Sequence, residues 1–333
     1  MSDKIYIIAE AGVNHNGSLD MALQLVAAAK AAGVDCVKFQ TFKAEKLVTA
    51  TAEKAEYQKT NTGNNDSQFA MLKKLELSVE DHHKLLKRCQ ELEIEFLSTG
   101  FDIESLDFLA ELPIQRFKIP SGELTNGPYL KQLAKKNFPT IMSTGMATMA
   151  EVEVAIELLL QNGLEENNLT ILHCSSEYPA AFAGVNLRAM QAMQKKFNLP
   201  VGYSDHTVGI EIATAAVAMG ATVIEKHFTL DKSLAGPDHQ ASLDPHELQA
   251  MVAAIRNVEQ ALGDGEKSPT KAELATAKVA RKSIIAAKNI KKGEKLSGDN
   301  LTVKRPGTGI SPMLWDQVIG TVAEKDYQVD EIL

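Results

Sequence analysis

Cysteine is scarce in this chain of 333 residues, which contains only Cys36, Cys89 and Cys174. An odd number without short-range pairing argues against a disulfide scaffold or a thiolate zinc site, and it suits a reduced cytoplasm. No apolar run approaches the roughly 18 residues that a membrane span needs. The opening segment Met1–Ala9 is too short for a signal-peptide core and has no cleavage signal. These absences predict a soluble, cytoplasmic protein without a membrane partner.

Positive charge is also in deficit, since the formal net charge is -8. A general nucleic-acid surface would need a basic excess, so nucleic acid is not expected as a partner. An acidic protein that handles an anionic substrate must concentrate its Lys and Arg locally, which draws interest to basic residues near a site. The length suits one large α/β domain of roughly 250 residues with a small second one.

What the chain does contain is an alternation of short apolar runs with amphipathic stretches. The runs predicted as strands are 4–9, 35–40, 95–99, 115–119, 139–143, 169–174, 199–203 and 222–227. The stretches predicted as helices include 19–32, 79–93, 147–162 and 209–219, several with a capping residue such as Ser18, Ser78 or Thr148. Eight such units in about 260 residues predict a (β/α)8 TIM barrel. An open doubly wound sheet is the alternative, but no Gly-rich dinucleotide loop follows the first strand.

Composition changes near Gly265, and this change sets the predicted domains. Residues 1–265 are predicted as the catalytic barrel, 266–282 as a linker with a helical turn or two, and 283–333 as a small C-terminal domain. A unit of roughly 50 residues is marginally stable alone and would gain from docking on something larger. Within the barrel, the polar segment 41–77, which includes Asn61–Asp66, is predicted as a long loop over the barrel mouth.

Two histidines, His206 and His227, stand at the ends of the seventh and eighth predicted strands. Consecutive strands of a parallel barrel deliver their C-terminal residues to one shared mouth. Two imidazoles side by side there can hold a divalent metal and leave most of its coordination sphere for substrate, with Asp205 as a candidate third partner. A lone buried histidine is more often a hydrogen-bonded core residue, so it is the pairing that favours a metal site.

The other strand ends are unusually polar. They carry Lys38, Lys118, Thr99, Ser121, Ser143, Ser176 and Ser204. Ammonium groups neutralise a phosphate and hydroxyls fill its remaining acceptors, so this rim predicts an oxyanion cradle. The alternative is that the hydroxyls cap the following helices and that the lysines are solvated. The carboxylates Glu10, Glu123 and Glu225 could carry protons, anchor substrate hydroxyls or pair with nearby lysines, and the sequence leaves these roles open.

Six motifs, in order and over nearly the whole chain, resemble the sialic acid synthase family. They are Ala9–Gly17, Lys118–Glu123, Ser143–Met146, Gly202–Thr207, Glu225–Phe228 and Gly236–His239. The unit around Lys304–Gly307 is similar to that family's antifreeze-like SAF domain, a β-clip. The resemblance implies condensation of phosphoenolpyruvate with the open-chain aldehyde of an N-acetylated mannosamine-type sugar. The products would be a nine-carbon 2-keto acid and phosphate.

The resemblance also implies roles for individual residues. His206 and His227 would hold Mn²⁺, or alternatively Mg²⁺ or Co²⁺, with Glu123 near the reacting centre. Phosphoenolpyruvate would be held by Lys38, Thr99, Lys118, Ser121, Ser143, Ser176 and Ser204. The sugar would face Gln40, Tyr178, Asp238 and Asn16. Arg305 would reach the sugar's acetamido group from the small domain of a second subunit, which implies a domain-swapped homodimer.

Asn16 is the residue that best distinguishes between the branches of the family that this sequence resembles. The branch that forms N-acetylneuraminate commonly has a glutamate there, whereas an amide is neutral and donates as well as accepts. Asn16, with weaker support from Ser176, favours the branch that makes N,N'-diacetyllegionaminate from 2,4-diacetamido-2,4,6-trideoxymannose. N-acetylneuraminate from N-acetylmannosamine is the alternative, and pseudaminate is third. From other classes, a Schiff-base aldolase using Lys118 or Lys226 and a non-catalytic sugar-binding protein also stay open.

Overall fold

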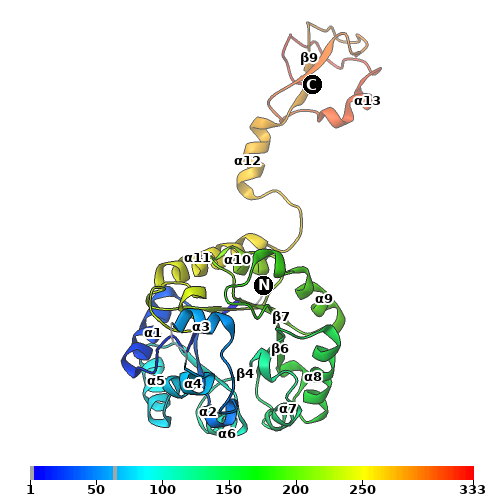
Figure 1. The fold of residues 1–333 in the computed structure, drawn as a ribbon. Coiled ribbons are helices and arrows are strands. Elements are labelled where there is room, and N and C mark those ends of the chain that lie inside the picture. The colour runs from blue at the N-terminus through cyan, green and yellow to red at the C-terminus, as the bar shows by residue number, and fades with distance from the viewer. Residues whose placement is uncertain (1–3, 63–65) are drawn as a thin grey trace. The chain divides into compact units, whose positions relative to one another are not determined.

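A closed barrel of eight parallel strands, ringed by helices, dominates the fold (Figure 1). The computed structural model describes residues 4–62 and 66–333. The barrel strands are β1 (Tyr6–Gly12), β2 (Cys36–Thr41), β3 (Glu95–Gly100), β4 (Phe117–Ile119), β5 (Thr140–Ser143), β6 (Leu169–Cys174), β7 (Val201–Asp205) and β8 (Val223–His227). Because β1 pairs with both β2 and β8, the sheet has no open edge. The predicted (β/α)8 barrel is therefore confirmed, and the open doubly wound sheet is excluded.

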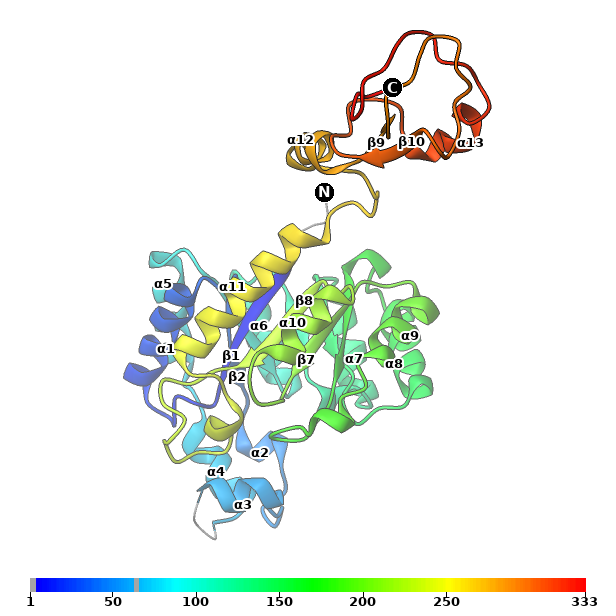
Figure 2. The ribbon, with the colours of Figure 1, turned by 90° about the horizontal axis from the view of Figure 1, so that it is seen from above.

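Helices cover the outside of the barrel, and Figure 2 shows α1, α10 and α11 running alongside the strands. The barrel helices that follow the strand-to-helix pattern are α1 (Leu19–Ala32), α5 (Val79–Glu91), α6 (Ile103–Glu111), α7 (Gly127–Ala134), α8 (Met149–Gln161), α9 (Arg188–Phe197), α10 (Glu211–Ala218) and α11 (Pro245–Leu262). Ser18, Ser78 and Thr148 each accept a hydrogen bond from the backbone N–H three residues on, as N-caps do. Among the described residues, no helix combines the length and apolar character needed to cross a bilayer.

The barrel interior is built in layers that place polar side chains at the C-terminal ends of the strands. An apolar layer is formed by Ile8, Cys36, Leu97, Ile141, Leu172 and Val223. Gly202 belongs to this level, where a Cβ would lie only 2.4 Å from the Val223 carbonyl oxygen. Side chains two residues apart on a strand point the same way. The next inward positions, one level nearer the mouth, therefore include Glu10, Lys38 and Thr99.

The segment after β2 is not the long loop that the sequence predicted. It contains three short helices, α2 (Ala44–Leu47), α3 (Glu56–Thr62) and α4 (Gln68–Leu75). Of the polar run 61–66, residues 63–65 lie outside the described residues. Met71 and Leu75 of α4 pack with Val13 and Phe42 in a small apolar cluster. Burial of this helical face explains why a segment of polar composition folds over the barrel.

A second compact unit comprises residues 265–333, and the barrel comprises residues 1–264. The elements of the second unit are α12 (Lys271–Ala280), β9 (Ser283–Ala286), β10 (Leu301–Lys304) and α13 (Trp315–Val318). The strands β9 and β10 pair antiparallel over a core that includes Ile284, Ile290 and Leu296. The helix α12 lies in the stretch that the sequence predicts as a linker, and none of its residues is buried.

Candidate functional site

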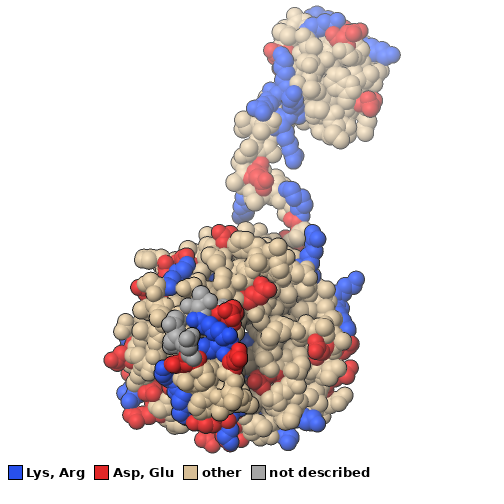
Figure 3. Space-filling view, viewed as in Figure 1, with Lys and Arg blue, Asp and Glu red and all other residues tan. Residues whose placement is uncertain are grey.

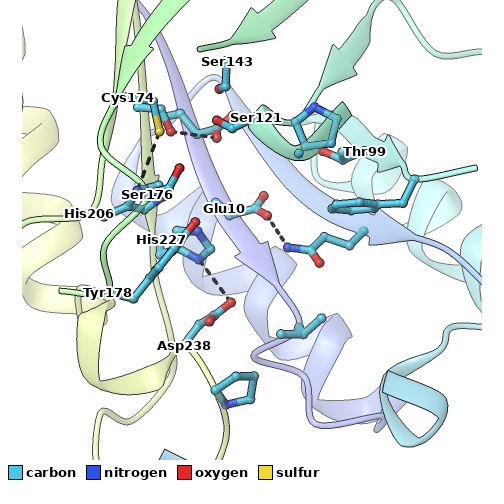
Figure 4. Close-up of a pocket in the computed structure, with 18 of the residues that line it drawn as sticks. Glu10, Thr99, Ser121, Ser143, Cys174, Ser176, Tyr178, His206, His227 and Asp238 are labelled. Carbon is cyan, nitrogen blue, oxygen red and sulfur yellow. Dashed lines mark hydrogen bonds and ion pairs between the residues drawn. The ribbon is translucent and has the colours of Figure 1, made fainter. Parts of the chain in front are cut away.

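A cavity of about 410 Å³ lies at the C-terminal ends of the barrel strands (Figure 4). Most of the predicted site residues line it: Lys38, Gln40, Thr99, Lys118, Ser121, Ser143, Ser176, Tyr178, Ser204, His206, His227 and Asp238. The space-filling view in Figure 3 is hollowed near the middle of the barrel face, with side chains of both charge signs around the hollow. The structure therefore brings together the residues of the predicted anion cradle and the two predicted metal ligands.

Three predicted site residues do not line this cavity. Glu123 lies in the 3₁₀ turn η1 (Ser121–Glu123), where its carboxylate accepts a hydrogen bond from Asn126 Nδ2 at 2.6 Å. Asn16 lines a smaller neighbouring pocket of about 200 Å³. Arg305 belongs to the second unit, where it is exposed. The roles assigned to these three residues stay predictions.

Four buried charges of alternating sign form the floor of the cavity. Lys38 Nζ lies 2.6 Å from Glu10 Oε2 and 3.8 Å from Glu225 Oε2. Lys118 Nζ lies 3.7 Å from Glu225 Oε1. Buried ions persist when they are paired, because an unpaired one has lost its hydration without compensation. The two carboxylates therefore hold both ammonium groups at the mouth.

The pKa values of these groups separate their roles. Burial raises the pKa of Glu10 to about 7, against the lowering effect of Lys38. Burial also acts to lower the pKa of Lys38, but Glu10 and Glu225 outweigh it and the pKa is raised. For Lys118 burial prevails, and its pKa is lowered despite nearby Glu225. The paired carboxylates thus favour the charged form of Lys38, while burial disfavours the charged form of Glu10.

Hydroxyl groups complete the rim around the ammonium groups. Lys38 Nζ donates to Thr99 Oγ1 at 3.0 Å, and Lys118 Nζ donates to Ser143 Oγ at 2.6 Å. Ser204 Oγ donates to the carboxylate of Glu225 at 3.1 Å. Hydroxyls and ammonium groups that converge in this way can bind an anion such as a phosphate.

The imidazoles of His206 and His227 lie side by side, with ring centroids 5.2 Å apart. His206 Nδ1 is 2.7 Å from the backbone oxygen of Ser175. Because a carbonyl only accepts, Nδ1 carries a hydrogen, and in the neutral ring Nε2 has the lone pair. His227 Nδ1 is buried without a hydrogen-bond partner in the described structure, and it lies 3.8 Å from Asp238 Oδ2. Figure 4 shows both rings beside Tyr178.

This arrangement fits a divalent cation. Burial, reinforced by nearby His206, holds the pKa of His227 well below its usual range, which favours the neutral ring that a metal ligand needs. Burial acts to lower the pKa of His206, but Cys174 and the Ser175 carbonyl raise it overall. Burial raises the pKa of Asp238 to about 6, and a nearby cation would offset that cost. Within the described residues no three His, Cys, Asp or Glu side chains form a group that could hold a metal ion, so the cation would have only the two imidazoles as protein ligands from such groups.

Asp205 and Lys226 point away from the cavity. Side chains alternate along a strand, so Asp205 faces opposite to Ser204 and His206 on either side of it. Lys226 Nζ donates to Asp205 Oδ2 at 2.7 Å, and both side chains are fully buried. The predictions of Asp205 as a third metal partner and of Lys226 as a Schiff-base nucleophile are therefore wrong, because the two groups neutralise each other outside the cavity.

Replacing Lys226 by methionine should lower the free energy of unfolding by about 3–5 kcal/mol, because it leaves Asp205 as a buried, unpaired charge. Chemical denaturation followed by circular dichroism measures this loss. The double variant Lys226→Met with Asp205→Asn removes both charges and should recover a large part of it. A single variant as stable as the wild type would contradict this role for the pair.

The apolar side of the cavity was not predicted from the sequence. This side is lined by Val13, Met71, Leu72, Leu75 and Phe101. Three of these residues come from α4, and their spacing of three and four residues was the available signal. The cavity thus combines a charged floor with an apolar side, which suits a ligand with both anionic and apolar parts.

Comparison with known proteins agrees with this geometry. The NeuB family model matches residues 25–267, and the SAF domain model matches residues 281–333. The N,N'-diacetyllegionaminic acid synthase of Campylobacter jejuni is 52% identical over 99% of each chain. The synthase of the same name from Legionella pneumophila is 54% identical over 95% of this chain and 89% of its own.

A solved structure is also similar along most of its length. The crystal structure of an N-acetylneuraminic acid synthetase from Leptospira borgpetersenii, in complex with citrate, has a TM-score of 0.72 at 33% sequence identity. The match covers 82% of this chain and 90% of that one. The resemblance seen in the six sequence motifs and in the C-terminal unit is therefore confirmed. This chain belongs to the NeuB family and carries a C-terminal SAF domain.

Proposed function

We propose that this protein is a metal-dependent sialic acid synthase that joins phosphoenolpyruvate to an open-chain N-acetylated amino sugar. The sugar we propose is 2,4-diacetamido-2,4,6-trideoxymannose, and the products are N,N'-diacetyllegionaminate and phosphate. The proposal depends on one observation, the presence of Lys38 and Lys118 in the same cavity as the paired imidazoles of His206 and His227. We propose Mn²⁺ as the cation, with Mg²⁺ or Co²⁺ as alternatives. The scarcity of cysteine supports a cytoplasmic site of action.

The residues of the cavity have distinct parts in this reaction. The C3 carbon of phosphoenolpyruvate bonds to the aldehyde carbon, water adds at C2, and the C–O bond to phosphate then breaks. Lys38 and Lys118 bind the anionic substrate and stabilise the charge that develops on the departing phosphate. Thr99 and Ser143, already bonded to those ammonium groups, keep them in position. His206 and His227 would hold the divalent cation, which would supply Lewis-acid polarisation of the aldehyde oxygen. Tyr178, which lies beside the two imidazoles in the cavity, orients the sugar.

Two observations support the trideoxy sugar. The apolar side of the cavity, which includes Val13, Met71 and Leu75, suits the methyl group of a 6-deoxy sugar. A sugar hydroxyl placed there would lose its hydrogen bonds to water without replacement. The relatives named N,N'-diacetyllegionaminic acid synthase are 52% and 54% identical, against 33% for the N-acetylneuraminic acid synthetase. N-acetylneuraminate synthesis from N-acetylmannosamine is the alternative.

Steady-state assays of phosphate release from phosphoenolpyruvate test the function and the sugar together. We expect kcat/KM for the trideoxy sugar to exceed that for N-acetylmannosamine by about tenfold or more, since an unpaired buried hydroxyl costs this much. A tenfold preference for N-acetylmannosamine would reverse the choice of sugar. Failure to release phosphate with either sugar, with Mn²⁺ present, would instead favour a non-catalytic sugar-binding protein.

We further propose that the protein is a domain-swapped homodimer in which Arg305 of one copy reaches the sugar in the barrel of the other. Arg305 is exposed, and a guanidinium offers fixed donors to an acetamido carbonyl. The second unit has more Lys and Arg than Asp and Glu, whereas the barrel is acidic. Opposite net charges favour association of the two.

Subunit mixing tests this arrangement. The His206→Ala and Arg305→Ala variants should each be nearly inactive alone. A mixed dimer should contain one complete site, with the barrel of one variant and the arginine of the other. Dissociating and reassembling the two variants together should therefore restore activity, and no gain over either variant alone would contradict the swapped site.

A further inference from the structure

The short turn 235–238 forms part of the cavity wall, and the predicted residue roles do not explain how this turn is held in place. It follows β8 and precedes the 3₁₀ turn η4 (His239–Ala241), and it contributes Pro237 and Asp238 to the cavity wall. Its backbone carbonyls are held by side chains from distant segments. Asn16 Nδ2 donates to the Ala235 oxygen at 3.0 Å, and Asn61 Nδ2 donates to the Pro237 oxygen at 2.8 Å.

Asn16 is held in turn by a buried histidine. His239 is fully buried, and its Nε2 lies 3.2 Å from Asn16 Oδ1. Its Nδ1 lies 2.7 Å from Thr229 Oγ1. Thr229, His239 and Asn16 thus form a continuous chain of contacts that ends on the Ala235 carbonyl, and we call this chain the Asn16 relay.

The direction of every hydrogen bond in the Asn16 relay follows from its last member. The Ala235 carbonyl can only accept, so the Asn16 atom facing it must be the amide nitrogen. The amide oxygen therefore faces His239, whose Nε2 must carry a hydrogen and donate. A neutral imidazole then accepts at Nδ1 from the Thr229 hydroxyl at 2.7 Å, a shorter contact than the 3.2 Å between that hydroxyl and the Asp231 carbonyl oxygen. The relay accordingly requires at position 16 a side chain that accepts on one side and donates on the other.

The backbone conformation and the packing at position 16 also favour asparagine there. Asn16 has a φ of 51°, a left-handed conformation in which asparagine is favoured among residues other than glycine. Packing is also tight, because a Cβ at Gly236 would lie 2.7 Å from Asn16 Oδ1 and 2.8 Å from His239 Nε2. A carboxylate at position 16 would place an oxygen against the Ala235 carbonyl and lose the donor.

We infer that Asn16 and His239 are positioning residues that fix the turn 235–238, and that Asn16 acts on the sugar through Asp238 rather than by direct contact. This inference rests on the proposed function for its effect on substrate. It replaces the predicted direct contact of Asn16 with the sugar, and it agrees with the position of Asn16 outside the main cavity. It also assigns a role to His239, to which the sequence motif alone gave none.

A matched pair of substitutions at His239 tests the inference. Glutamine places an amide nitrogen near the position of Nε2, so His239→Gln keeps the donor to Asn16. Asparagine is shorter and reaches only toward Thr229, so His239→Asn breaks the relay. Asn16→Asp breaks it from the other side. Each variant would be compared for KM of the sugar, KM of phosphoenolpyruvate and amide hydrogen exchange of residues 234–239.

We expect Asn16→Asp and His239→Asn to raise the KM of the sugar by about tenfold, as for the loss of a buried hydrogen bond. The KM of phosphoenolpyruvate should change by less than about twofold, since Lys38 and Lys118 lie on other strands. Exchange of the turn should become about fivefold faster or more in both variants. His239→Gln should restore both the KM of the sugar and the exchange rate.

The outcomes separate this inference from the proposed function. If the wild type does not turn over either sugar, the proposed function fails, and hydrogen exchange still tests the relay. If Asn16→Asp raises the KM of the sugar while His239→Asn changes neither KM nor exchange, Asn16 is a direct ligand and the inference is wrong. It is equally wrong if His239→Gln and His239→Asn behave alike.

Discussion

Replacing either His206 or His227 by alanine should reduce metal-dependent turnover by a factor on the order of 10³, because Lewis-acid stabilisation by a bound cation is worth several kcal/mol. Both rings line the cavity and would together hold the proposed cation, whereas one ring alone would hold it weakly. The fold should persist, since both side chains lie at the mouth of the barrel rather than in its apolar layer. Turnover and Mn²⁺ binding by calorimetry measure the effect.

His173 provides a matched control for these variants. It lies on β6, where Nε2 contacts the Val185 carbonyl at 2.7 Å, and it does not line the cavity. His173→Gln should therefore keep Mn²⁺ binding and turnover close to those of the wild type. Normal turnover of His206→Ala or His227→Ala in metal-free buffer would refute the ligand role of that histidine.

Replacing Lys118 by methionine should lower kcat by about 10²–10³-fold, the usual effect of removing one preorganised group that stabilises developing charge. Lys118 is almost fully buried between Ser143 and Glu225, so water cannot easily take its place. The substitution also leaves Glu225 with one partner fewer. The double variant Lys118→Met with Glu225→Gln restores the charge balance, and it should regain stability but not turnover.

The same lysine also distinguishes the proposed reaction from a Schiff-base mechanism. Burial lowers the pKa of Lys118, a property that a nucleophilic amine would share. If its role is to stabilise phosphate, borohydride with both substrates should leave the enzyme active, whereas a metal chelator should inactivate it. A borohydride-trapped adduct on Lys118, with no effect of the chelator, would establish the aldolase instead.

The fold was predictable from sequence because barrel strands and helices leave strong local signals. The run Leu169–Cys174 is apolar and bounded by polar residues, and it forms β6 over the predicted range. Ser18 and Gly33 mark the start and end of α1, where Gly33 has a φ of 82° that suits glycine. The helices α2, α3 and α4 were missed because they are only four, seven and eight residues long, too short for a helical spacing of apolar residues to stand out.

The site was predictable to the extent that strand ends converge, which is a property of the barrel topology. Alternation along a strand was the signal left unused, and it separates His206, in the cavity, from Asp205 beside it. Contacts between distant segments leave no local pattern. Residues 16 and 239 are far apart in sequence, so the contact between Asn16 and His239 becomes visible only in three dimensions.

The central claim is that paired imidazoles hold a cation beside an anion site formed by lysines. Anomalous diffraction from a crystal soaked with Mn²⁺ and phosphoenolpyruvate tests this most directly. We expect one manganese peak within bonding distance of both His206 and His227, with the phosphate bound at Lys38 and Lys118. Phosphoenolpyruvate bound with manganese absent from the two rings, or manganese bound elsewhere, would contradict the claim.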